Sequence, residues 1–415
     1  MNINLDFKIK KFKLYLKDPL YKNSFFLLLS SISNGVIGFI FWIIAAKMYP
    51  QEDIGITTAL ISSMTLIVIL SGVGLDQSLI RFFPERDKNS IFNTIIITSI
   101  ISSTLFATIF LAGIGIWSPK LIIIREYAPL FILFISANTL SSLIGISFIA
   151  SRKANLYFLE TLLLGSKILL VVPLVFLGHM GLFISFTLPF LISTVFLLFL
   201  PFKFNIKHLN IDLNFLKESI YFSSGSYITN LLMTTPSQII SLITINVLGA
   251  KLTADYFMAY SISSLLFMIP YSFSSSLFVE GSHGEPLPKK TLKSLLGMFS
   301  ILIPMVLFFY FFGAFFLEFL GKDYLEGLNL LKVLTLSSFF VAVCSTYISL
   351  KKIQKDVKSL VLLGGLIFML TIGLSYPFIH IFGLIGIGYA WFVGYGLCSF
   401  IIFFLSRNNR FSLKD

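Results

Sequence analysis

Two ionisable side chains, Glu160 and Lys167, interrupt one apolar run of the sequence and are its first candidates for chemistry. Both fall in the stretch 156–178, which is otherwise dominated by Leu, Val and Phe. An ionisable residue within a membrane span is costly, so it is treated as functional by default. Seven residues correspond to about 10.5 Å of helix rise, too far for an ion pair but on one helix face. We expect both to point into a hydrated cavity. The alternative is that each contacts polar side chains of neighbouring helices.

Further charged residues stand at the ends of apolar runs. Asp76 is a candidate gate residue, although solvation at the membrane interface explains it equally well. Arg81 and Arg152 lie in short basic connections, where a guanidinium group is suited to attract phosphate. Lys332 and Glu318 lie near the outer ends of neighbouring runs, and there we expect a structural salt bridge.

No pattern in the sequence indicates a catalyst or a metal centre. The four histidines are scattered over loops and span ends, and Cys344 and Cys398 lie apart within apolar runs. The sequence has no phosphate-binding glycine loop, no Cys-x-x-Cys pair and no Asp-x-Asp pair. We therefore expect no enzyme activity, no cofactor and no metal. Energy for transport must come from ion gradients, the membrane potential or consumption of the product.

The composition is that of an integral membrane protein. Of the 415 residues, 56% are hydrophobic and 12% are charged, and the mean hydropathy is +0.92. A soluble globular chain is about 25% charged. Runs of roughly 20 apolar residues can span a bilayer as helices. Twelve such runs are found, at 24–46, 57–80, 91–117, 128–150, 156–178, 181–201, 215–248, 255–279, 292–319, 327–350, 359–380 and 382–406.

The distribution of Lys and Arg predicts the orientation. With the N-terminus inside, 24 of the 31 basic residues face the cytoplasm, as the positive-inside rule requires. We expect a multi-pass protein of the cell (inner) membrane with both termini cytoplasmic. The segment 1–22 is interpreted as a basic anchor, or alternatively as a helix lying on anionic headgroups. The positive-inside distribution explains the net charge of +12, so we expect no nucleic-acid partner.

The two halves of the chain resemble each other. Asp53 aligns with Asp255 at an offset of 202, and the same offset places Arg152 on Gln354. The turn at Gly178 is similar to the turn at Gly383, at an offset of 205. Since six spans per half is an even number, the halves are parallel repeats. We predict an all-α protein of two parallel six-helix repeats around a central cavity, with bundles at 23–205 and 206–406 and a cytoplasmic tail at 407–415.

Polar residues concentrate in the first two spans of each half. Most are Ser and Thr, for which close helix–helix contact is the simpler interpretation. The larger amides of Asn34, Asn230 and Gln238 need several hydrogen-bond partners, so we take them as candidate cavity-lining residues. Pro236 and Pro270 interrupt the backbone ladder of the seventh and eighth spans. The resulting bends could serve motion or static shape equally well.

The motifs around the first spans resemble a known superfamily. They are Lys22–Ser24 at the opening of the first span, Met48–Gly55 after it, and Gly72–Phe82 at the end of the second. In this order they are similar to the multidrug/oligosaccharidyl-lipid/polysaccharide (MOP) exporters, specifically the oligosaccharide-lipid (Wzx-type) flippases. The resemblance implies a V-shaped cavity walled by spans one, two, seven and eight. Lipid II flippases of this superfamily carry two further helices and several arginines in the cavity wall, which argues against a peptidoglycan precursor as cargo.

The sequence therefore predicts a flippase that moves a polyprenyl-(pyro)phosphate-linked oligosaccharide to the outer leaflet by alternating access. The alternative is a multidrug/cation antiporter of the MATE branch, for which Glu160 could supply the carboxylate. A membrane polymerase or ligase would need a long external loop, and every connection is short. Expected partners are the lipid-linked oligosaccharide, membrane lipids, and the polymerase and glycosyltransferases of the same pathway, with the protein itself a monomer.

Overall fold

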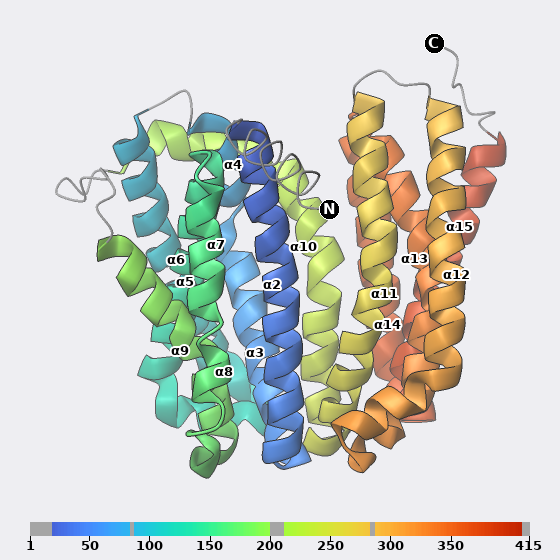
Figure 1. Ribbon diagram of the computed structural model, residues 1–415, viewed down its shortest axis with the longest axis horizontal. Helices are drawn as coiled ribbons and strands as arrows, with labels where there is room; N and C mark the ends of the chain where they lie inside the picture. The colour runs from blue at the N-terminus through green and yellow to red at the C-terminus, as the bar shows by residue number, and fades with distance from the viewer. Residues whose placement is uncertain (1–18, 84–86, 200–210, 283–286, 409–415) are drawn as a thin grey trace, which may run out of the picture. The chain divides into compact units, whose positions relative to one another are not determined.

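The computed structural model describes residues 19–83, 87–199, 211–282 and 287–408, and all regular structure in these ranges is helical (Figure 1). The segment 1–22, apart from its last four residues, and the tail from 409 lie outside the described residues. Eleven of the helical segments are long and apolar enough to cross a membrane, and they confirm eleven of the twelve predicted spans. The protein is a polytopic all-α membrane protein.

The first half of the chain folds into long helices with shorter helical segments between them. Its helices are α2 (Pro19–Met48), α3 (Gln51–Gly72), α4 (Leu75–Phe82), α5 (Lys88–Trp117), η1 (Pro119–Tyr127), α6 (Ala128–Ala150), α7 (Ala154–Leu164), α8 (Lys167–Leu170), η2 (Val175–Leu177) and α9 (Gly178–Phe199). The label η marks 3₁₀ helices.

The second half has the same order with fewer interruptions. Its helices are α10 (Leu213–Val247), α11 (Ala250–Ser282), α12 (Leu287–Leu320), η3 (Lys322–Gly327), α13 (Leu328–Ile353), α14 (Val357–Phe382) and α15 (Ile385–Asn408). In both halves the fourth span is entered through a 3₁₀ helix, η1 before α6 and η3 before α13.

Backbone geometry supports the internal repeat. Gly178 (φ 56°, ψ −138°) and Gly383 (φ 65°, ψ −142°) adopt the same conformation before α9 and α15. Arg152 (φ 57°) and Lys355 (φ 56°) are both in the left-handed region, which non-glycine residues enter rarely. The backbone conformation thus pairs Arg152 with Lys355. The sequence alignment had paired Arg152 with Gln354, one residue earlier. The two-repeat layout is confirmed.

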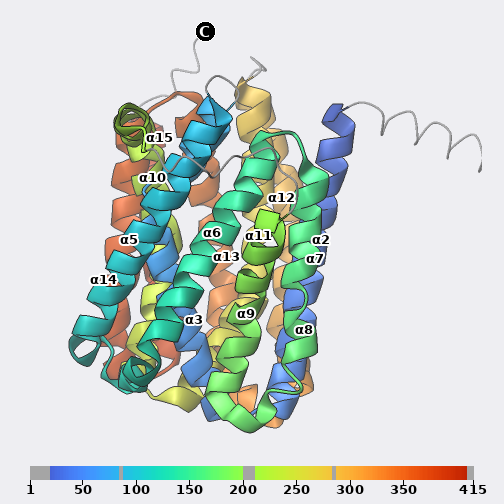
Figure 2. The ribbon, with the colours of Figure 1, turned by 90° about the vertical axis from the view of Figure 1, so that its left-hand side faces the viewer.

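The predicted span 156–178 is not one continuous helix. It consists of α7 and the short helix α8, which Figure 2 shows one after the other, and the 3₁₀ helix η2. At the first interruption, the Ser166 N–H bonds three residues back, to Leu163 O at 3.0 Å, and the Gly165 N–H is shared between Leu162 O at 3.0 Å and Thr161 O at 3.2 Å. Gly and Ser are weak helix formers, and Pro173 has no N–H for the second interruption. The single helix expected here was therefore wrong.

The chain clusters into two compact units, each with its own packing. The first holds residues 1–49, 67–113 and 123–224, and the second holds 50–66, 114–122 and 225–415. In the first unit α2 packs against α7, and α6 packs against α9; in the second, α13 packs against α11 and α15. The buried core of the second unit joins α11, α12 and α13 through Leu266, Met298, Leu302, Val306, Phe309 and Ala342.

Candidate functional site

Glu160 on α7 is a carboxyl group enclosed by the first unit. Its side chain is 3% exposed. Oε1 accepts a hydrogen bond of 2.7 Å from the Ser141 hydroxyl of α6, whereas Oε2 has no partner among the described residues. A Cβ at Gly145, one turn along α6, would collide with Oε2. The face of α6 is therefore shaped to admit this carboxyl group.

Lys167 is the first residue of α8 and lies between two aromatic rings. Its Nζ is 5.0 Å from the centroid of Phe186 on α9 and 5.8 Å from that of Phe41 on α2. Cation–π contacts of this kind stabilise an ammonium group without neutralising it. In the described part of the chain no carboxylate pairs with Lys167. The hydroxyl of the adjacent Ser166 is buried and has no hydrogen-bond partner there either.

Glu160 and Lys167 do not share the helix face that the sequence predicted. Glu160 contacts α6 through Ser141, whereas Lys167 contacts α2 and α9. The interruption of the helix at Gly165 and Ser166 separates them, because residues on either side of it no longer follow one 3.6-residue period. The alternative interpretation was that each residue contacts polar side chains of a neighbouring helix. For Glu160 the structure provides such a contact, with Ser141 of α6.

The other predicted site residues are spread over both units. Asn34 on α2 is exposed, and Asp76 lies partly exposed in the first turn of α4. Arg81 is exposed in the last turn of α4, and Arg152 is exposed at the tight turn before α7. These four belong to the first unit, with Glu160 and Lys167.

The two amides of α10 belong to the second unit. Asn230 is exposed, and its backbone carbonyl accepts a hydrogen bond of 2.8 Å from the Thr234 hydroxyl. Gln238 is half-buried and donates to the Ser237 hydroxyl at 3.3 Å. Exposed amides on a membrane-spanning helix have hydrogen-bonding capacity left for water or cargo.

The salt bridge expected between Lys332 and Glu318 is not formed. The Nζ of Lys332 instead lies 5.3 Å from the ring centroid of Tyr310 on α12. A cation over an aromatic face avoids placing two charges in an apolar environment, where desolvation offsets the attraction of an ion pair.

Sequence reasoning did not identify the neighbours of Glu160 and Lys167. Ser141 and Gly145 stand four residues apart on α6, a spacing that marks one helix face, and this was a usable signal for a close polar contact. Phe41 and Phe186 gave no signal, because the chain contains 47 phenylalanines. Only the packing of α2 and α9 around α8 selects these two.

Residues of the Met48–Gly55 motif contact the start of α11. The starts of α3 and α11 both belong to the second unit. The Gln51 amide donates to Asp255 Oδ1 at 2.8 Å, and Asp255 is 1% exposed. A Cβ at Gly55 would collide with the carbonyl of Ala250. A pocket of about 500 Å³ opens beside this contact, lined by Pro50, Gln51, Glu52, Lys251, Asp323 and Glu326.

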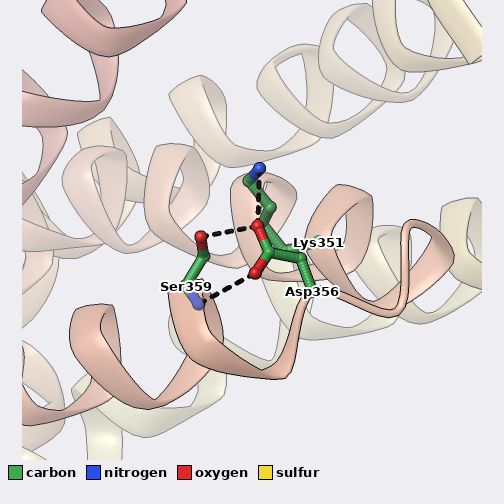
Figure 3. A network of polar contacts seen from close by, with 3 residues as sticks. All are labelled: Lys351, Asp356 and Ser359. Atoms are coloured by element: carbon green, nitrogen blue, oxygen red, sulfur yellow. Dashed lines mark hydrogen bonds and ion pairs between the residues drawn. The ribbon is translucent and has the colours of Figure 1, made fainter.

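The connections between the fourth and fifth spans of the two repeats are capped differently. In the second repeat Asp356 caps α14: its carboxylate accepts from the Ser359 hydroxyl at 2.6 Å, the Ser359 N–H at 3.1 Å and Lys351 Nζ at 3.0 Å (Figure 3). The hydrogen bonds from Ser359, with the help of Lys351, lower the pKa of Asp356 to about 2. In the first repeat the cap comes from α2, where the Asn23 side chain accepts from the Ala154 N–H at 3.1 Å. Asn23 belongs to the Lys22–Ser24 motif at the opening of the first span.

Comparisons with known proteins identify a family and a fold. Residues 20–278 match the model of the family described as "Polysaccharide biosynthesis protein". The fold is similar to that of a multidrug resistance MATE family transporter of the MOP superfamily in an inward-facing conformation, with a TM-score of 0.74, 16% identity, and 92% and 95% of the two chains covered. It is also similar to the lipid II flippase MurJ in an inward closed conformation, with a TM-score of 0.71, 18% identity, and 92% and 87% covered.

A third similar structure is a MOP superfamily transporter from Pyrococcus furiosus whose binding pocket is described as having reverse polarity. Its TM-score is 0.59 at 15% identity, with 97% of this chain and 96% of that chain covered. No curated protein matches the chain at a significant level. The similar structures are transporters and a flippase, and none of these comparisons indicates an enzyme.

Proposed function

The chain belongs to the polysaccharide biosynthesis protein family, and from that premise we propose that it is a flippase for a polyprenyl-(pyro)phosphate-linked oligosaccharide. The cargo passes from the cytoplasmic to the outer leaflet of the cell membrane by alternating access. The family match and the MOP-superfamily fold support a membrane transporter. The cargo is inferred from the side chains described above.

The observation that carries the proposal is a cation without a counter-ion at an interrupted helix. Lys167 stands where α8 begins, against two aromatic rings, and no described carboxylate pairs with it. Irregular backbone within a membrane span is tolerated where it is buried in protein or lines a water-filled cavity. Discontinuous helices also form the substrate sites of many transporters. A phosphate group would neutralise Lys167 and accept its hydrogen bonds.

The uncharged polar groups suit the glycan. Asn34, Asn230 and Gln238 offer amide donors and acceptors, which match the many hydroxyl groups of a sugar. The prenyl chain remains in lipid during transport. With a negative cell interior, outward movement of each negative charge gains about 2.3 kcal/mol per 100 mV. Both termini in the cytoplasm, a monomeric state, and partnership with the polymerase and glycosyltransferases of the same pathway are parts of the proposal.

A leaflet-resolved transport assay tests the role of Lys167. The full chain is reconstituted in vesicles with a fluorescent polyprenyl diphosphate carrying a short oligosaccharide. Lys167→Ala should lower the initial rate about 10- to 100-fold, the loss expected for one charged hydrogen bond, and Lys167→Arg should retain part of it. Lys332→Ala is the matched control, since Lys332 also stands over an aromatic ring within a span. Full activity of Lys167→Ala would refute the assignment.

A drug/cation antiporter is the second candidate, because the enclosed carboxyl of Glu160 has no described cationic partner. The two functions separate in a deletion strain. Loss of a flippase alters the surface glycan and leaves drug susceptibility unchanged, whereas loss of an antiporter raises susceptibility and leaves the glycan intact. The cationic Lys167 on the following short helix favours an anionic cargo.

A further inference from the structure

The end of the short helix α8 is held by a side chain that is distant in the sequence. The hydroxyl of Tyr49, the residue that follows α2, donates a buried hydrogen bond of 2.7 Å to the backbone carbonyl of Val171. Tyr49 is 4% exposed, and Val171 is fully buried. Both residues belong to the first unit. The hydrogen bond therefore connects the end of α2 with the interrupted fifth span.

The interruption of the span explains why this carbonyl takes a side-chain donor. In a continuous helix the carbonyl of Val171 would accept a hydrogen bond from the N–H of Val175, four residues further on. That N–H instead bonds to Val172 O at 3.3 Å. A buried carbonyl without a donor is unfavourable, and the Tyr49 hydroxyl provides one. The hydrogen bond thus stabilises the irregular backbone at this place.

The carbonyl that Tyr49 holds lies at the end of the turn that carries Lys167. The N–H of Val171 bonds to the Lys167 carbonyl at 3.0 Å and so closes the turn of α8. Since α8 has four residues, it has few backbone hydrogen bonds of its own to keep it in place. A contact that fixes the peptide group of Val171 therefore also fixes the backbone of Lys167.

The same face of α2 supplies one of the two aromatic rings around the Lys167 ammonium group. Phe41, Ala45 and Tyr49 follow at intervals of four residues, which places them on one helix face, and all three are buried. The ring of Phe41 lies 5.8 Å from Lys167 Nζ. Figures 1 and 2 show α8 beside α2, and the two helices are in contact. Thus α2 contacts α8 at two points, through Phe41 at the lysine side chain and through Tyr49 at the backbone.

The second repeat has neither the interruption nor the tyrosine. Its fifth span is the continuous helix α14, which carries no lysine after its second residue, Lys358. At the offset that aligns Asp53 with Asp255, Tyr49 corresponds to Lys251, whose side chain is 66% exposed. A fifth span of this fold therefore forms without a tyrosine hydroxyl. The tyrosine occurs in the repeat whose fifth span is interrupted and carries a lysine at the interruption.

We propose that Tyr49 is a positioning residue for Lys167. Its hydroxyl holds the Val171 carbonyl, and with it the turn of α8, so that the ammonium group stays between Phe41 and Phe186. The assignment rests on the proposed flippase function, in which Lys167 receives a phosphate group of the cargo. A charged hydrogen bond to phosphate depends on the distance and direction of the donor. Tyr49 is enclosed and acts on the cargo only through α8.

Chemical modification of Lys167 tests its placement without any transport. The full chain in detergent is treated with a limiting amount of a reductive methylation reagent, and mass spectrometry follows the rate at each lysine. Tyr49→Phe removes only the hydroxyl and should speed the modification of Lys167 severalfold, because the ammonium group is no longer held between the two rings. The exposed Lys217 of the same unit is the internal reference and should keep its rate. An unchanged rate at Lys167 would overturn the proposal.

Tyr256→Phe is the matched control, because it also removes a buried tyrosine hydroxyl that donates to a backbone carbonyl. That hydroxyl bonds to Ser237 O at 3.1 Å in the second unit. Both variants should lower the thermal unfolding midpoint. Only Tyr49→Phe should change the reactivity of Lys167, and an equal change in Tyr256→Phe would show a general loosening of the fold instead of positioning.

Transport of the fluorescent polyprenyl diphosphate oligosaccharide shows whether Tyr49 acts through Lys167. Tyr49→Phe should raise the KM about 3- to 10-fold, as expected for part of one charged hydrogen bond, and should leave the maximal rate nearly unchanged. In the Lys167→Ala background the same substitution should cause no further loss. Additive losses would contradict a role that passes through Lys167.

The two experiments keep the two proposals distinguishable. Faster modification of Lys167 in Tyr49→Phe alone supports the positioning role even where the wild type transports no lipid-linked oligosaccharide, an outcome that would refute the flippase. Unchanged modification refutes the positioning role even where the lipid-linked oligosaccharide is transported.

Discussion

Gln51 donates a hydrogen bond of 2.8 Å to Asp255 and so connects the first turn of α3 to the first turns of α11. The aspartate is enclosed, and its second oxygen has no hydrogen-bond partner among the described residues, so the Gln51 amide is the side-chain donor that satisfies it there. The neighbouring ion pair, Glu52 with Lys251 at 3.8 Å, is largely exposed and contributes little. The contact between the two helices therefore depends on the buried amide–carboxylate bond.

A double-mutant cycle on this pair should show clear coupling. Gln51→Ala leaves the buried carboxylate without its donor, which costs about 1–3 kcal/mol of unfolding free energy. Asp255→Ala and the double variant complete the cycle, and we expect the double variant to be less destabilised than the sum of the singles. The measurement is unfolding of the purified protein in detergent. Simple additivity would show that the hydrogen bond does not hold the two helices together.

Substitution of Gly55 should destabilise the same contact by collision. A Cβ at this position meets the backbone of Ala250, which cannot rotate away as a side chain can. Gly55→Ala should cost about 1–3 kcal/mol, the usual effect of overpacking. Gly38→Ala on α2 is the control, because nothing lies within 4 Å of its Cβ position. There the better helix propensity of alanine should leave stability unchanged or raise it. The prediction is wrong if both variants unfold at the wild-type temperature.

The contact between Glu160 and α6 should be sensitive to both partners. Gly145→Ala places a methyl group on Glu160 Oε2 and should lower the unfolding midpoint. Adding Glu160→Asp, which withdraws the carboxyl by one methylene, should recover part of that loss. Glu160→Gln keeps an acceptor for the Ser141 hydroxyl and should be milder than Glu160→Ala. Thermal unfolding of the five proteins, wild type included, decides the matter, and a failed rescue would contradict the close packing described here.

The cap at Asp356 should give a defined pH dependence. Its pKa in the folded protein is about 2, below the roughly 3.9 of an unfolded chain. The stabilisation is therefore complete above about pH 4 and is lost as the pH falls through 2. Asp356→Ala should cost about 1 kcal/mol at neutral pH through loss of the cap. Unfolding should be followed from pH 6 to pH 2 for both proteins. Their difference should shrink towards acid, and a constant difference would argue against the cap.

Much of the architecture could be predicted from the sequence, because spanning a bilayer depends on local composition. A window of about 20 apolar residues forms a helix in lipid whatever its neighbours are. Eleven of the predicted spans have their counterparts in the structure for this reason. The repeat was visible for a similar reason, since turns such as those at Gly178 and Gly383 need particular residues. The exact pairing of Arg152 with Lys355 required the backbone angles.

The interruption at Gly165 and Ser166 could not be predicted, because hydropathy does not report backbone hydrogen bonds and both residues are common in continuous membrane helices. The sequence alone determined that the chain spans a membrane in two related halves and carries an acid and a base in its fifth span. Only the tertiary structure decided that Glu160 contacts α6 while Lys167 contacts α2 and α9. The reason is physical: a side chain's partners come from helices distant in the sequence, and a break in one helix changes which of them it meets.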